Sequence, residues 1–171
     1  MTPSAREKVF LKAADLMESD VPRFENLLID ESGSVKGKAV FETLYTVEIL
    51  RTAGGEARRL YGETFPNDKP NRMSMVIREP VGVVAVVSPY NGPLILLAKM
   101  ALFALAAGNS VVAKPSEETP MVAVELAKLM HEAGLPAGVF NVLTGYGLEV
   151  TASSPGGRLV AVCISMTVCV V

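Results

Sequence analysis

The sequence predicts an α/β fold in which a helical N-terminal part is followed by a parallel βαβ sheet. Two apolar runs rich in β-branched residues, at 81–87 and 110–114, have the composition of strands, and the first is expected to be buried on both faces. Between them, residues 94–107 are apolar and favour a helix, and Gly108 is placed to end it. Such a unit normally has parallel strands and a right-handed crossover, so both carboxyl ends lie at one edge of the sheet.

Three helices are expected before the sheet. Thr2 or Ser4 can cap the first, whose apolar face recurs at helical spacing from Val9 to Met17. The second follows Pro22 and ends in the polar stretch 31–34. The third covers about residues 36–61, with an expected buried stripe of Ala39, Val40, Leu44, Val47, Ile49 and Leu50. Two adjacent glycines, Gly54 and Gly55, indicate either a kink in this helix or another element packed closely on it.

The remaining elements are marked by prolines and glycines. Residues 65–71 hold two prolines and an Asn-Asp pair, which predicts a surface loop, and 73–79 alternates partly before Pro80, as edge strands do. After Lys114, a helix is expected to begin with Thr119 as N-cap and to end before Gly134. A third strand follows at 139–143, and a turn containing Gly145 comes after it.

Composition excludes several classes of protein. The chain has 171 residues, 50% of them hydrophobic and 20% charged, which is typical of one globular domain rather than a disordered chain. A net charge of −2 without a basic block argues against a nucleic-acid partner. Cys163 and Cys169 lack metal-ligand spacing, so no metal site is expected. Residues 1–12 do not resemble a secretory signal, and the apolar helix is shorter than the ~20 residues of a membrane span, so we expect a cytoplasmic protein without membrane association.

Two polar clusters fall where the first two strands end. Ser88-Pro89-Tyr90-Asn91 follows the first strand, and Lys114-Pro115-Ser116-Glu117 closes the second. Ligands of such sheets collect at the carboxyl ends of the strands. Asn91 is either a turn residue that caps the next helix or an amide donor for a negatively charged oxygen. Lys114 and Glu117 form either a pair on a solvated loop or part of a ligand site. Gly145 is either a plain turn residue or a point of close backbone approach to a ligand.

An ordered set of motifs resembles the cofactor domain of the NAD(P)-dependent aldehyde dehydrogenases. The set consists of S-P-Y-N-G-P at 88–93, V-V-A-K-P-S-E at 111–117, G-L-P at 134–136, G-V-F-N-V at 138–142 and T-G-Y-G at 144–147. The resemblance covers residues 1–150 and implies a partial Rossmann-like domain, whereas 151–171 is a diverged apolar tail. Tyr90 replaces the tryptophan more usual in the motif, and Gly92 replaces a bulkier residue.

The resemblance implies a role for each residue of the two clusters. Asn91 would stabilise the oxyanion formed when an aldehyde is oxidised to a carboxylic acid. Lys114 and Glu117 would hold the adenosine ribose of the cofactor, and Ser116 with Ser88, Pro89 and Tyr90 would line the same groove. Gly145 would lie on the adenine side. A carboxylate at Glu117 would repel a 2′-phosphate, which favours NAD over NADP. The region 65–79 would make subunit contacts, in a homo-oligomer or with a full-length relative.

The resemblance fades after residue 150. The family's Gly-Ser helix start, its catalytic cysteine and its glutamate base are not found, and Cys163 and Cys169 lie in an apolar run unlike the surroundings of a nucleophile. We therefore expect a fragment that does not oxidise aldehydes alone; the alternative is a non-catalytic nucleotide-binding or subunit-association module. Residues 159–171 are β-prone. They either add a strand beside 139–143 or derive from a reading-frame or splicing change, which we favour.

Overall fold

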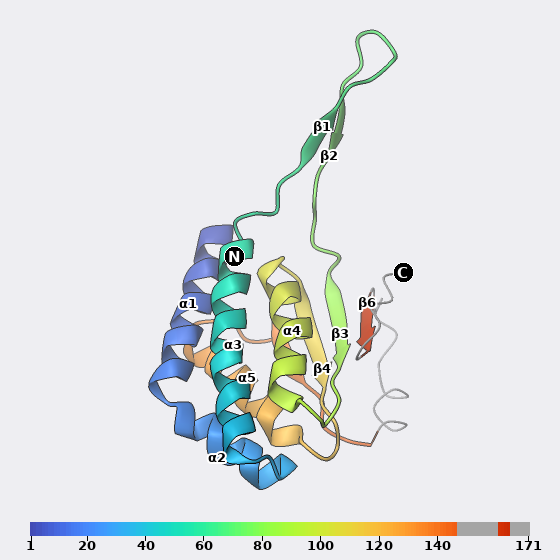
Figure 1. Ribbon diagram of the computed structural model, residues 1–171. Helices are drawn as coiled ribbons and strands as arrows, with labels where there is room; N and C mark the ends of the chain where they lie inside the picture. Colours follow the sequence, from blue (N-terminus) through green and yellow to red (C-terminus); the bar gives the residue numbers. More distant parts are fainter. Residues whose placement is uncertain (147–160, 165–171) are drawn as a thin grey trace.

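Helices cover one face of a parallel sheet in the computed structural model, which describes residues 1–146 and 161–164 (Figure 1). The helices are α1 (Pro3–Ser19), α2 (Val21–Ser32), α3 (Lys36–Glu56), α4 (Pro93–Ala106) and α5 (Pro120–Glu132). The helices α4 and α5 pack on the sheet, and α1, α2 and α3 pack in turn on these two. The described part of the chain contains no helix that is both long and apolar enough to cross a membrane.

The parallel sheet has the strand order β5-β4-β3-β6. Its strands are β3 (Val83–Val87), β4 (Ser110–Lys114), β5 (Phe140–Val142) and β6 (Ala161–Ile164). One crossover helix, α4, joins β3 to β4, and another, α5, joins β4 to β5, because the sequence alternates strand and helix from 83 to 142. The α/β class with a helical N-terminal part and a partial Rossmann-like sheet is therefore confirmed.

The strand β6 does not lie where one of the two interpretations of the tail placed it. It pairs with β3, from Val84 opposite Ala161 to Val87 opposite Ile164, and not with the strand at 139–143. The physical reason is the length of the strand that offers the edge: β3 has five residues, whereas β5 has three, so β3 can form the longer ladder of backbone hydrogen bonds. Cys169 and the rest of the expected tail strand lie outside the described residues.

The expectation that the first strand is buried on both faces holds on one face only. Val84 and Val86 point toward the helices and are buried, whereas the alternate residues Val83, Ala85 and Val87 are more exposed. The crossover helices α4 and α5 connect strands that follow each other in the same direction across the sheet, so both lie on the same side (Figure 1). Among the described residues, the other face of the sheet has no covering helix.

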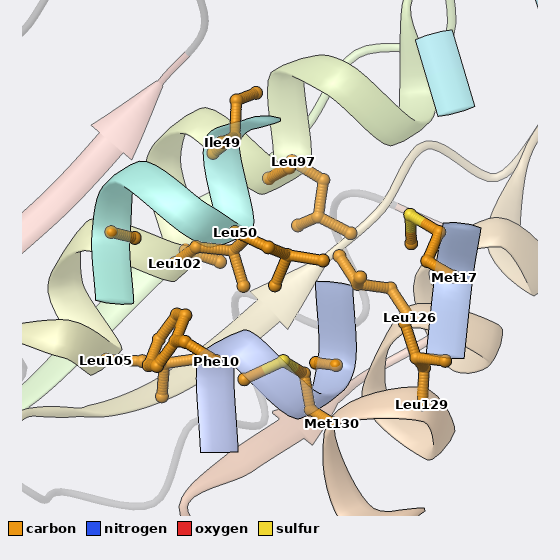
Figure 2. Packing of buried hydrophobic residues seen from close by; sticks show 14 of the residues in the cluster. Phe10, Met17, Ile49, Leu50, Leu97, Leu102, Leu105, Leu126, Leu129 and Met130 are labelled. Carbon is orange, nitrogen blue, oxygen red and sulfur yellow. The ribbon is translucent and has the colours of Figure 1, made fainter. Parts of the chain in front are cut away.

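The hydrophobic core lies between the sheet-covering helices and the N-terminal helices. Figure 2 shows side chains from α1, α3, α4 and α5 converging in this layer. Phe10, Leu50, Leu97, Leu102, Leu126, Leu129 and Met130 are fully buried there. Because α4 contacts the sheet on one side and α3 on the other, it is apolar over most of its surface, as the sequence predicted.

The N-terminal helices begin and end close to the predicted positions. Thr2 caps α1, since its hydroxyl accepts a hydrogen bond from the Ala5 N–H at 3.2 Å. Gly33 ends α2 with a φ of 64°, a left-handed conformation that glycine adopts at little cost. The helix α3 ends at Glu56, before the predicted limit of residue 61.

The buried face of α3 differs from the predicted apolar stripe. Ala39, Val47, Ile49 and Leu50 are buried, but Val40 is half-buried and Leu44 is 44% exposed. The buried positions include polar residues, Glu42, Thr43 and Thr46, because α3 is packed between α1 and α4 rather than on a single neighbour. The two threonine hydroxyls donate to the carbonyls four residues earlier, at 2.9 and 2.8 Å, so their burial leaves no donor unpaired.

Close packing, rather than a kink, explains the first of the two helical glycines. A Cβ at Gly54 would lie 3.0 Å from Cβ of Phe10 and 3.5 Å from the Glu7 carbonyl oxygen on α1. A Cβ at Gly55 would meet only the end of the Arg59 side chain, at 3.5 Å. The glycine at 54 therefore lets α1 approach α3, and the glycine at 55 has no such role.

These two glycines give a matched pair of variants. Alanine favours a helix over glycine by about 1 kcal/mol, so Gly55→Ala is expected to raise the free energy of unfolding by up to that amount. Gly54→Ala is expected to lower it by about 1–3 kcal/mol, because the added methyl group forces α1 and α3 apart. Urea unfolding followed by circular dichroism measures both. Equal stabilisation by the two substitutions would contradict the close contact at Gly54.

A two-stranded hairpin extends away from the helices and the sheet (Figure 1). Its strands are β1 (Glu63–Phe65) and β2 (Ser74–Val76), paired antiparallel. The edge strand predicted at 73–79 is therefore present but shorter, and Phe65 lies in a strand rather than in the predicted loop. Several large apolar side chains of this hairpin and its flank are exposed: Phe65, Met73, Met75, Val76 and Ile77.

Candidate functional site

Three loops lie side by side at the carboxyl ends of β3, β4 and β5. The Ser88 N–H, directly after β3, donates to the Lys114 carbonyl at 3.0 Å, and the Leu143 N–H, directly after β5, donates to the Ala113 carbonyl at 2.8 Å. Val87 stands opposite Lys114 in the parallel register. The polar clusters that the sequence placed at the strand ends are thus held at one edge of the sheet by backbone hydrogen bonds.

Asn91 lies in the turn between β3 and α4. It is exposed, as is Tyr90, which is 63% exposed. The N-cap residue of α4 is Gly92, without a side-chain capping bond, so the alternative that Asn91 caps this helix is wrong. The residues that follow the turn, Gly92, Pro93 and Leu94, are all buried and anchor it to the fold. Asn91 is therefore an accessible amide on a well-packed turn, able to donate to a group outside the fold.

Lys114 and Glu117 form an ion pair at the end of β4. The Lys114 Nζ lies 3.3 Å from Glu117 Oε2 and donates to the Pro115 carbonyl at 3.0 Å. The Lys114 side chain is only 12% exposed, whereas that of Glu117 is 44% exposed. A hydrogen bond from its own backbone N–H and then the Lys114 ammonium hold the pKa of the Glu117 carboxyl below its usual range. Lys114 is therefore more buried than expected for an ion pair on a solvated loop. The Glu117 carboxylate is ionised at neutral pH.

The other predicted residues line the same edge in different ways. Ser116 Oγ accepts from the Glu118 N–H at 3.2 Å and so shapes the loop after β4. Ser88 is 4% exposed and Pro89 is half-buried, and the Ser88 N–H is already bonded to the Lys114 carbonyl. Gly145 has a φ of 147°, a conformation that other residues rarely adopt. All of the predicted site residues are therefore brought to one edge of the sheet.

The edge supplies both a hydrogen-bond donor and an acceptor for hydroxyl groups of a ligand. An ammonium group has three donors, and two of those on Lys114 are directed at Pro115 and Glu117, which leaves one for an external hydroxyl. The exposed carboxylate of Glu117 supplies an acceptor for the hydroxyl protons. In the described residues, no group of three His, Cys, Asp or Glu side chains lies close enough together to hold a metal ion.

Two carboxylates near this edge were missed by the sequence reasoning. Glu31 of α2 accepts hydrogen bonds from the first turn of α5. Glu42 of α3 is 2% exposed and accepts a hydrogen bond from the Ile95 N–H of α4 at 3.5 Å. The carboxylate of Glu42 also lies 2.6 Å from the Lys38 Nζ. The position of Glu31 in its helix, which Asp30 shares, is a signal that could have found it. A carboxylate in the last turn of a helix is unfavourable for that helix, which indicates a partner elsewhere.

Comparison with known proteins gives one consistent result. A model of the aldehyde dehydrogenase family matches residues 1–161. The chain is 43% identical over 152 residues to the (Z)-2-((N-methylformamido)methylene)-5-hydroxybutyrolactone dehydrogenase of Acinetobacter baylyi, covering 89% of this chain and 31% of that protein. It is 42% identical over 153 residues to the 3-sulfolactaldehyde dehydrogenase of Priestia aryabhattai, covering 87% and 32%. The chain thus spans about a third of the length of these curated relatives.

Solved structures agree with the sequence matches. An aldehyde dehydrogenase from Brucella melitensis biovar abortus 2308 superposes with a TM-score of 0.90 at 31% identity, covering 95% of this chain and 34% of that one. An NADP-dependent enzyme of E. coli gives 0.83 at 35% identity, covering 86% and 31%. An NAD-dependent aldehyde dehydrogenase from Sinorhizobium meliloti gives 0.87 at 36% identity, covering 95% and 32%. Neighbours thus include enzymes named for either cofactor.

Proposed function

Because the chain belongs to the aldehyde dehydrogenase family, we propose that it carries the oxyanion-stabilising and ribose-binding part of an enzyme that oxidises an aldehyde to a carboxylic acid with NAD. The observation that supports this most directly is the row of three loops at the carboxyl ends of β3, β4 and β5. These loops bring Asn91, the Lys114–Glu117 pair and Gly145 to one edge of the sheet.

Asn91 is the one residue of this chain to which we assign part of the chemistry. When a nucleophile adds to an aldehyde, the carbonyl oxygen becomes negatively charged, and a neutral amide donor stabilises that charge. An amide does not give up a proton at neutral pH, so it stabilises the oxyanion without protonating the nucleophile. The buried residues Gly92 and Pro93 hold the turn in place, which keeps the donor oriented before the reaction begins. The 171-residue chain alone is proposed to be inactive, since its cysteines lie in an apolar run.

Lys114 and Glu117 are proposed to bind the cofactor rather than to react. NAD, when bound, accepts the hydride removed from the substrate. Lys114 donates to a ribose hydroxyl while Glu117 accepts from one, and the ion pair between them fixes both side chains. The ionised Glu117 would repel the 2′-phosphate that distinguishes NADP from NAD, which is why we propose NAD as the cofactor.

A second function, subunit association, is supported by the β1–β2 hairpin. Its exposed side chains include Met75 at 56% and Ile77 at 66%, an unusual concentration of apolar surface on a two-stranded element. A hairpin of this kind is marginally stable alone and gains from pairing with another chain. We therefore propose that this segment contacts a second copy of the chain or a full-length relative.

Titration calorimetry tests cofactor binding. Lys114→Ala is expected to weaken NAD binding by about tenfold or more, because a hydrogen bond from a charged group contributes about 1.5–3 kcal/mol. The control is Lys128→Ala, which removes an exposed lysine of α5 that pairs with Glu125 at 3.2 Å, away from the site. The control should leave the affinity unchanged. Absent heats in the wild type and in both variants would remove the proposal of cofactor binding.

A further inference from the structure

A carboxylate of α2, that of Glu31, caps the N-terminus of α5. One oxygen of Glu31 accepts from the Met121 N–H at 2.6 Å, and the other accepts from the Val122 N–H at 3.0 Å. These two donors belong to the first turn of α5, where N–H groups have no partner within the helix. Glu31 lies on α2, 90 and 91 residues earlier in the chain. The contact is therefore a helix cap supplied from another element.

The residue in the usual capping position does not perform this task. Thr119 is the N-cap residue of α5, but its side chain makes no capping hydrogen bond. Its hydroxyl oxygen is buried and has no hydrogen-bond partner among the described residues. Glu31 thus replaces the local cap. A carboxylate in the last turn of α2 opposes the dipole of its own helix, whereas at the N-terminus of α5 the helix dipole favours its negative charge.

The helix N-terminus that Glu31 caps directly follows the loop between β4 and α5, at which the proposed ribose-binding pair lies. Lys114 is the last residue of β4, and α5 begins at Pro120, so the loop is held at one end by the sheet and at the other by the first turn of α5. Within it, the Glu118 N–H donates to Ser116 Oγ, and the Thr119 N–H donates to the Ser116 carbonyl, both at 3.2 Å. A shift of the first turn of α5 would therefore be passed to Ser116 and Glu117.

We propose that Glu31 is a positioning residue for the Lys114–Glu117 pair: by binding Met121 and Val122, it fixes the end of the loop from which Glu117 projects. This inference rests on the proposed function only for the identity of the ligand. The connection from Glu31 through the first turn of α5 to the loop after β4 is made by the hydrogen bonds described above. Glu31 touches neither member of the pair, so it acts through the backbone.

A matched control exists on the same pair of helices. Arg23 of α2 binds Glu132 near the end of α5 with two hydrogen bonds of 3.1 Å, so Glu132→Gln also weakens the contact between α2 and α5. Glu132 lies at the opposite end of α5 from the loop. If Glu31 served only to pack α2 on α5, Glu31→Gln and Glu132→Gln should therefore have the same effect on the loop.

The test compares Glu31→Gln, Glu132→Gln and the wild-type chain by amide hydrogen exchange read by NMR, together with NAD titration. In Glu31→Gln we expect the amides of Met121 and Val122, and those of Glu118 and Thr119 in the loop, to exchange at least about tenfold faster. NAD affinity should fall about three- to tenfold. Glu132→Gln should leave the loop amides and the affinity unchanged.

Two results would overturn the proposal. One is unchanged exchange at Glu118 and Thr119 in Glu31→Gln, and the other is an equal increase in both variants, which indicates a loss of helix packing only. The exchange decides the role of Glu31 even if the wild-type chain binds no NAD. That last outcome would instead refute the proposed function, so the two failures are distinguishable.

Discussion

Alanine in place of Asn91 is expected to lower kcat by a factor of about 10²–10³. The enzyme to measure is a chimera in which residues 1–146 of this chain replace the matching part of the 3-sulfolactaldehyde dehydrogenase of Priestia aryabhattai, to which this chain is 42% identical. The amide is proposed to bind the oxygen only once it is negatively charged, so KM should change much less than kcat. The assay follows formation of the carboxylic acid from 3-sulfolactaldehyde, with NAD and NADP supplied in separate reactions.

Three controls separate the role of Asn91 from damage to the fold. Asn91→Asp should lose at least as much activity, because a carboxylate repels the negative oxygen instead of binding it. Asn26→Ala removes an exposed amide from α2, away from the site and from the hairpin, and should leave kcat unchanged. The 171-residue chain alone should give no turnover. Retention of most of the activity by Asn91→Ala would contradict its assignment, and turnover by the chain alone would contradict its proposed inactivity.

Phe10→Ala is expected to lower the free energy of unfolding by about 3–5 kcal/mol, the range seen when large buried side chains are truncated. Phe10 is fully buried, and Figure 2 shows its ring among side chains of the neighbouring helices. The close approach of α1 to α3 at Gly54 leaves little room for the helices to collapse further into the cavity. The loss would be a large part of the roughly 5–15 kcal/mol by which domains are stable.

The matched control for this prediction is Phe103→Ala. Phe103 also lies in a helix, α4, so the change in helix propensity is the same, but its side chain is 39% exposed. We expect a loss of less than about 1 kcal/mol there. Urea unfolding of both variants gives the comparison. Similar losses at the two positions would mean that the contact between α1 and α3 adds little to the core.

Local signals in the sequence were sufficient for most elements. The Thr2 cap, the glycines after α2, α4 and α5, and the β-branched runs of β3 and β4 each act within a few residues of themselves. The position of the site followed from the same signals, because the carboxyl ends of parallel strands meet at one edge whatever else surrounds them. The sequence was therefore sufficient to predict that Asn91, Lys114 and Glu117 lie at one edge of the sheet.

The features that sequence reasoning missed depend on partners far along the chain. Leu44 was assigned to a buried stripe, but the face of α3 is chosen by α1 and α4 together, and it buries Glu42 instead. Thr119 has the sequence of an N-cap, yet Glu31 supplies the capping oxygens. The strand β6 of the tail pairs with the longer strand β3 and not with β5. In each case a local preference was overridden by a contact that only tertiary packing creates.

The order of the elements along the chain has a consequence for synthesis on the ribosome. Within the described residues, the helices α1 to α5 and the strands β3, β4 and β5 all end by residue 142, and each of these strands pairs with one separated from it by a single helix. Domains of nascent chains fold as units while translation continues, and every side chain of this core belongs to that part of the chain. The core in Figure 2 can therefore assemble as soon as residue 142 is released. The free edge of β3 then acts as the template on which residues 161–164, emerging later, add the outermost strand.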